Sequence, residues 1–100
     1  MKRLLAIATV LGLAGCAARQ PPIATAADAQ RASIALADLE QGRTLLIRKC
    51  GGCHRPPMPT EHRAAEWPGK LDEMAIRSNL DGEQRRALQQ YLVTMADARR

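Results

Sequence analysis

The sequence predicts a small all-helical fold, and three observations lead to that fold class. Apolar residues recur at helical spacing both before residue 50 and after residue 81. No segment alternates apolar and polar residues as a half-buried strand does. Residues 50–60 are interrupted by Gly and Pro, so they are expected to form a loop between helices. The 100 residues suffice for one domain.

The first fifteen residues are predicted to be a signal peptide. Lys2 and Arg3 precede an apolar run over residues 4–13, and small residues follow, which is the order of a secretory signal. The run is too short for a permanent membrane-spanning helix, which needs about 20 apolar residues. A cut near Ala17 or Ala18 and an uncleaved anchor are alternatives to the lipid-modified form described next.

The last three residues of the signal and the Cys that follows them read "LAGC", residues 13–16, which resembles the lipobox of bacterial lipoproteins. The resemblance implies that Cys16 is acylated, becomes the new N-terminus and anchors the chain on the periplasmic side of a bacterial membrane. Ala17 resembles a signal for sorting to the outer membrane. An exported chain with an odd number of cysteines has one thiol left over after disulfide pairing, and that thiol has to be accounted for. With Cys16 lipidated, Cys50 and Cys53 remain as a pair.

Residues 16–30 are predicted to be the lipidated Cys and a flexible tether, and residues 31–100 the folded domain. The alternative is that the second half of the tether already belongs to the first helix. Fourteen flexible residues reach roughly 20 Å as a coil. The full chain has 15 basic and 10 acidic residues, and two of the basic ones belong to the signal. Without the signal, 13 basic and 10 acidic residues give the chain a net charge of +3. The basic residues are scattered and lack aromatic neighbours, which argues against nucleic acid and favours a surface that meets an acidic protein.

One amphipathic helix is predicted over residues 31–49. Its apolar positions at helical spacing are Ala32, Ala35, Leu36, Leu39, Leu45 and Leu46. Gly42 lies on the same side and lowers helix propensity by about 1 kcal/mol relative to Ala. Another helix is therefore expected to approach closely at Gly42, and a tolerated surface Gly is the alternative.

The second half of the chain is predicted to hold three further helices. A short one is expected over residues 60–66, because the residue before Pro68 is disfavoured in a helix. Pro68 suits the first turn of the next helix, residues 68–77. Asp81 with Gln84 three residues later predicts a capping box at the start of the last helix. The apolar stripe of that helix comprises Ala87, Leu88, Tyr91, Leu92 and Met95.

The segment "CGGCH" matches C-x-x-C-H, the attachment sequence for c-type haem. The thiols of Cys50 and Cys53 have the spacing to add to the two vinyl groups on one porphyrin edge, and His54 is then carried under the iron as its proximal ligand. Gly51 and Gly52 let the backbone turn tightly against the ring. One covalent haem c is therefore the predicted cofactor. It would supply the large apolar body missing from a chain with one Trp, one Tyr and no Phe.

Three other uses of the cysteine pair remain open. A thioredoxin-like redox motif normally lies in a βαβ context, which is not evident here. A structural zinc needs four ligands, so His54 and His62 would both have to join the two thiols. A plain disulfide is permitted by an exported location.

The sixth iron ligand is predicted to be Met74. Met58 is excluded because the four residues after His54 span at most about 14 Å, too little to round the edge of the ring. Met95 lies on the apolar stripe of the last helix, where Met is usually core filler. Met74 follows His54 by twenty residues, which is ample chain to reach the far face. His62 is the alternative ligand. A further alternative is that Met74 is only a buried core residue, beside an iron that is open or differently ligated.

Together these features resemble the small class I cytochrome c domains over about residues 38–96. The residues that carry the resemblance are "GRTLLIRKCGGCH", the Trp-Pro pair at 67–68, Met74 and "DGEQRRALQQYL". The resemblance implies a cytochrome c-like fold wrapped around one haem. It also implies that the first and last helices cross closely, with Gly42 receiving Tyr91.

The resemblance has a further implication and two departures. A backbone carbonyl after the haem-binding segment, from Pro57 or Pro59, is expected to orient the proximal imidazole. Leu46 stands where the family often has an aromatic residue. No Gly-Pro-Asn-Leu loop is present, so the ligand assignment rests on residues 67–74.

The expected function is electron transfer. With His54 and Met74 as axial ligands no coordination position stays open, and such ligation raises the reduction potential. We expect a membrane-tethered periplasmic carrier, not an enzyme by itself, that is free or a subunit of an oxidoreductase and serves a dehydrogenase, oxidase or reductase. Basic side chains expected to steer an acidic partner are Arg48, Lys49, Arg55 and Arg63. A haem sensor in which Met74 dissociates and a haem-free thiol-redox lipoprotein are the alternatives.

Overall fold

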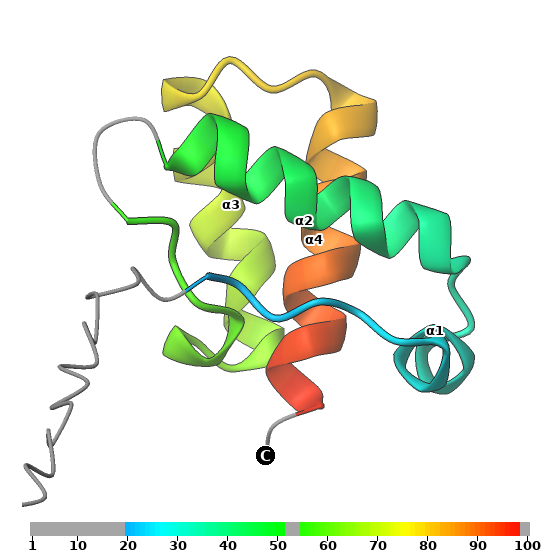
Figure 1. Cartoon of the computed structure of the whole chain (residues 1–100). Helices are drawn as coiled ribbons and strands as arrows, with labels where there is room; N and C mark the ends of the chain where they lie inside the picture. The colour runs from blue at the N-terminus through cyan, green and yellow to red at the C-terminus, as the bar shows by residue number, and fades with distance from the viewer. Residues whose placement is uncertain (1–19, 52–54, 99–100) are drawn as a thin grey trace, which may run out of the picture.

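The computed structural model describes residues 20–51 and 55–98. Within them the chain forms four α-helices and two 3-10 turns and no strand, so the predicted all-α fold is confirmed (Figure 1). The α-helices are α1 (Ala26–Ala32), α2 (Leu36–Cys50), α3 (Trp67–Arg77) and α4 (Gly82–Asp97), and the 3-10 turns are η1 (Pro59–Glu61) and η2 (Ala64–Glu66). None of the described helices is long and apolar enough to cross a bilayer.

Helix α2 crosses in front of α4 (Figure 1), and the two helices make close contact at Gly42. A Cβ atom at position 42 would lie 2.5 Å from the Cβ of Tyr91 and closer still to the carbonyl oxygen of Ala87. Both neighbours belong to the buried face of α4. The predicted close approach is therefore confirmed, because only a residue without a side chain lets the two backbones come this near.

The core lies where α2, α3 and α4 meet. Its largest fully buried side chains from these helices are Leu39, Leu46, Trp67, Leu71, Leu88, Tyr91 and Leu92. Ala87 and Met95 are buried as well, so the predicted apolar stripe of α4 faces the core along its whole length. Each large side chain removed from water contributes about 1.5–3 kcal/mol. These contacts hold the ends of α2 and α3, which carry the candidate site, in fixed relation.

The helix predicted over residues 31–49 is confirmed over residues 36–49, but it does not start at residue 31, because the chain breaks at Ser33. This residue has a left-handed backbone with φ 54°. Its N–H donates to the carbonyl of Gln30 at 3.2 Å, and the N–H of Ile34 donates to the carbonyl of Ala29 at 3.0 Å. These two bonds form a Schellman motif, which ends α1 and lets α2 start in a new direction.

The tether predicted over residues 16–30 is shorter than expected, since its second half packs on the folded body. Pro21 is fully buried, and its carbonyl accepts a hydrogen bond of 2.9 Å from Nε of Arg43. The carbonyl of Pro22 accepts one of 2.6 Å from the hydroxyl of Tyr91. The folded part therefore begins near residue 21 and not at residue 31, because long-range contacts outweigh the tether-like composition.

The chain between α2 and α4 follows the predicted order with one difference. The short helix expected over residues 60–66 is replaced by η1 and η2, which are separated by the extended backbone of His62. Helix α3 starts one residue before Pro68, which lies in its first turn. The capping box of α4 is confirmed: Asp81 accepts from the N–H of Gln84 at 2.8 Å, and the Gln84 side chain accepts from the N–H of Asp81 at 3.1 Å.

Candidate functional site

Cys50 is the last residue of α2, and the helix ends at Gly51. The Cys50 side chain is half-buried and packs against the core. Gly51 caps the helix with φ −89° and ψ −1°. A Cβ atom at position 51 would collide with the carbonyl oxygen of Ile47, one turn back. The chain thus leaves α2 through a turn that favours glycine for lack of space.

The thiol of Cys50 lies near the end of α3. Its surroundings include the side chain of Ser78, which directly follows the last residue of that helix and acts to lower the pKa of the thiol. Burial raises the pKa of the Cys50 thiol above its ordinary value, and the Ser78 side chain opposes part of that rise. Without a bound group, this cysteine is therefore a protonated, weakly reactive thiol at neutral pH.

Met74 lies one turn before Ser78 on α3. The backbone N–H of Ser78 donates to the Met74 carbonyl at 2.9 Å, and residues four apart share a helix face. Met74 is half-buried and packs against the same core as Cys50. The structure therefore brings Cys50 and Met74, predicted from segments more than twenty residues apart, to the same part of the molecule.

The other methionines and the second histidine have contacts of their own. The ring of His62 meets Trp67 edge-on, with centroids 4.9 Å apart and planes at 87°. Its Nδ1 lies 3.6 Å from a carboxylate oxygen of Glu66. Met95 is only 2% exposed within the core, and Met58 is half-buried just before η1. Core packing alone accounts for Met95, as the sequence predicted.

Two contacts between elements that the sequence did not predict hold α3 in place. Nε1 of Trp67 donates to the carbonyl of Pro59 at 2.8 Å inside the core, which ties η1 to the first turn of α3. The guanidinium of Arg85 on α4 donates to the carboxylate of Asp72 and, at 3.4 Å, to the carbonyl of Pro68. The partners belong to different elements, so no local spacing rule marks them. Together they determine where Met74 lies.

The described residues fit a haem attached at the end of α2. Cys50 and Met74 are each partly accessible and backed by buried apolar side chains, the surroundings that an inserted apolar ring needs. Gly51 adds no side chain beside the attachment point. The predicted basic residues around the motif, Arg48, Lys49, Arg55 and Arg63, are all exposed.

The predicted residues Cys16, Cys53 and His54 lie outside the described part of the chain. Across residues 20–51 and 55–98, no group of three or more His, Cys, Asp or Glu side chains could hold a metal ion. Iron ligation by His54 and lipidation of Cys16 therefore stay predictions.

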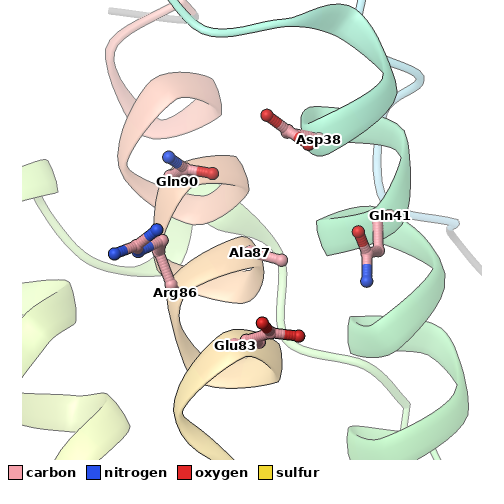
Figure 2. A pocket seen from close by; sticks show the side chains of 6 residues that line it. All are labelled: Asp38, Gln41, Glu83, Arg86, Ala87 and Gln90. Carbon is pink, nitrogen blue, oxygen red and sulfur yellow. The ribbon is translucent and has the colours of Figure 1, made fainter.

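A separate polar groove lies between α2 and α4. Figure 2 shows the side chains that line it, which are Asp38, Gln41, Glu83, Arg86, Ala87 and Gln90. From Asp38, α2 runs about three more turns before it reaches Cys50. The groove is therefore distinct from the candidate site.

Comparisons with protein-family models, with curated proteins and with solved structures find no match for this chain. The functional assignment consequently rests on the C-x-x-C-H sequence and on the arrangement of Cys50, Ser78 and Met74.

In the reduced, haem-free protein, we expect the pH of half-maximal alkylation of Cys50 to exceed that of the same cysteine in the denatured chain. The thiolate is the reacting form, and a raised pKa lowers its fraction at every pH below that value. Ser78→Ala removes the hydroxyl that favours the thiolate, so it should move the midpoint higher still. Alkylation followed by peptide mass spectrometry over a pH series measures both; a midpoint at or below the denatured value would contradict the burial of this thiol.

Proposed function

We propose that this chain is a single-haem c-type cytochrome, held by a lipid on the periplasmic side of a bacterial membrane, that carries electrons between protein partners. The observation that carries the proposal is the meeting of Cys50 with the end of α3, one turn from Met74. A C-x-x-C-H sequence identifies the attachment edge. The nearby Met supplies a candidate for the opposite axial position.

Each residue of the proposed site has a separate task. Cys50 and Cys53 would hold the porphyrin edge through thioether bonds, and His54 and Met74 would take the two axial positions. A haem bound in this way supplies a one-electron ferric/ferrous couple. Because both axial positions are then occupied by side chains, small ligands are kept from the metal and electron transfer is favoured over ligand binding.

The fold also suits rapid electron exchange. The Gly42 crossing, the Trp67–Pro59 bond and the Arg85–Asp72 contact fix both helices that carry the site. Little rearrangement of the site is then needed when its charge changes. The exposed basic residues near the motif favour an acidic patch on the partner, such as a dehydrogenase, oxidase or reductase.

We expect Met74→Ala to abolish the weak red absorption band that marks iron–sulfur bonding to Met, and to lower the reduction potential. The reason is that a thioether ligand favours the reduced iron. Met58→Ala is the matched control, because chain reach excludes it as a ligand, and it should keep the band. Absorption spectra of the oxidised proteins and a redox titration measure both effects.

Two other outcomes would count against this assignment. Carbon monoxide binding to the reduced wild-type protein would favour a haem sensor in which Met74 dissociates. Loss of the normal axial ligation in His62→Ala, with Met74→Ala unchanged, would transfer the ligand role to His62.

A further inference from the structure

Residues 20–25, here called the strap, pass over α4 before α1 begins (Figure 1) and are bonded to both α2 and α4. Two backbone carbonyls fasten its first part: that of Pro21 accepts from Arg43 at 2.9 Å, and that of Pro22 accepts from Tyr91 at 2.6 Å. Pro21 is fully buried, and Ala24 is only 5% exposed. The strap is thus part of the folded body.

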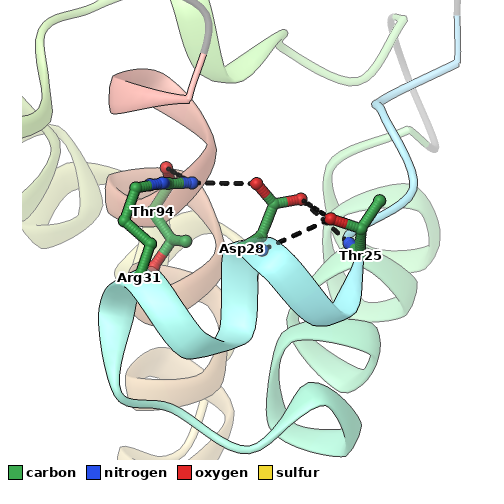
Figure 3. Close-up of polar contacts among 4 residues, drawn as sticks. All are labelled: Thr25, Asp28, Arg31 and Thr94. Carbon is green, nitrogen blue, oxygen red and sulfur yellow. Dashed lines mark hydrogen bonds and ion pairs between the residues drawn. The ribbon is translucent and has the colours of Figure 1, made fainter.

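Helix α1 fastens the other end of the strap (Figure 3). Thr25 caps the helix: its N–H donates to Asp28 at 2.8 Å, and its hydroxyl accepts from the N–H of Asp28 at 3.3 Å. Asp28 also accepts from Arg31 at 2.9 Å, and the same guanidinium donates to the carbonyl of Thr94 on α4 at 3.4 Å. The strap is therefore anchored to the helical body on both sides of Ile23.

Because the strap is fixed to the body, only a short linker separates the domain from a lipid attached upstream. From Cys16 to Pro21 there are five residues, which span at most about 17 Å when fully extended. The fourteen-residue tether predicted from composition would span about 48 Å. A domain fastened at Pro21 is thus confined to the immediate vicinity of the lipid headgroups.

We propose that the strap seats the domain directly on the bilayer surface, with Ile23 in contact with lipid. Ile23 is 70% exposed, although the prolines before it and Ala24 after it are anchored, so its apolar side chain is held out from the body. It lies seven residues after the lipid attachment point. This inference rests on lipidation of Cys16 within the proposed function. A domain seated in this way would require the redox partner to expose its redox centre close to the same membrane surface.

The test uses the full chain, exported, loaded with haem and reconstituted in vesicles of phosphatidylethanolamine and phosphatidylglycerol. In this protein Cys16 would carry lipid and Cys50 and Cys53 the haem, so a Cys introduced by Glu40→Cys is the single free thiol for a spin label. Position 40 lies one turn from Arg43 on α2 and is exposed. A nickel-chelating headgroup lipid then reports proximity to the surface through relaxation of the label.

A flexible Gly-Ser insert of about fifteen residues between Ala18 and Arg19 would lengthen the linker about fourfold, and we expect it to lower the relaxation, since a longer flexible linker lets the domain move away from the surface. Arg43→Gln with Tyr91→Phe, which removes both side-chain donors to the strap, should also lower it. Ile23→Ser should weaken the relaxation without changing the linker.

Equal relaxation with and without the insert would overturn the inference, as would an undiminished signal in Ile23→Ser. Dimerisation or capture of a soluble protein through Ile23 in the absence of vesicles would overturn it too. Failure of the protein to float with vesicles would show that Cys16 carries no lipid and would end the inference. The haem spectrum of the same sample would still test the electron-carrier proposal independently.

Discussion

Gly42→Val is expected to unfold or severely destabilise this protein. The new side chain would have to occupy space now taken by the Ala87 carbonyl and the Tyr91 side chain, and a helix backbone cannot move aside as a flexible side chain can. Overpacking a well-packed core usually costs about 1–3 kcal/mol, and this position should reach or exceed the upper value. For a domain of this size, a loss of about 3 kcal/mol lowers the Tm by roughly 12 to 24 °C.

Gly69→Ala is the matched control for that variant. Gly69 lies within α3, and a Cβ atom there meets nothing within 4 Å. Replacing a helical Gly by Ala should then stabilise the protein by about 0.5–1 kcal/mol. Thermal unfolding followed by circular dichroism measures both. Equal melting temperatures for Gly42→Val and wild type would mean that α2 and α4 do not cross as described.

Replacing both motif cysteines, Cys50→Ser with Cys53→Ser, is expected to eliminate covalent haem completely. The two thioether bonds are the only covalent links that the proposed site provides. A domain below about 80 residues has difficulty stabilising itself with side chains alone, so the variant should also melt at a lower temperature than the haem-loaded protein. Haem staining after denaturing electrophoresis and thermal unfolding measure the two effects.

Ser78→Ala serves as the control for the cysteine variant. It removes the hydroxyl near the Cys50 thiol and leaves both thiols in place, so it should keep one haem per chain. Covalent haem in the double cysteine variant would contradict the proposed attachment. Loss of haem in Ser78→Ala alone would mean that the hydroxyl has a role in attachment beyond its effect on the pKa of the thiol.

The parts of the fold that depend on local sequence could be predicted. The capping box of Asp81 and Gln84 and the start of α3 near Pro68 follow from spacing within a few residues. The crossing at Gly42 was also predictable, because a Gly within an apolar helix face has a propensity cost that close packing can offset.

The parts that depend on distant contacts could not be predicted. Composition suggested a tether around Pro21 and Pro22, but Arg43 and Tyr91, more than twenty residues away, bind their carbonyls. The break at Ser33 escaped prediction because Ser does not usually adopt a left-handed backbone and no Gly marks the end of α1.

The candidate site divides in the same way. The C-x-x-C-H motif is contiguous, so the sequence identifies its residues directly. The place of Met74 depends on the packing of α3, in which Trp67 is bonded to Pro59 of η1 and Asp72 to Arg85 of α4. Ser78 carried no signal, since a serine after a helix is common and only the fold brings it to Cys50.

A pyridine haemochrome spectrum, together with the intact mass, of the protein exported with a cytochrome c maturation system would show whether Cys50 and Cys53 hold a haem. We expect a c-type spectrum and a mass increase of one haem per chain, with Cys50 and Cys53 resistant to alkylation after reduction. A chain without haem, in which both cysteines become alkylated after reduction, would contradict the cytochrome assignment and favour a thiol-redox lipoprotein.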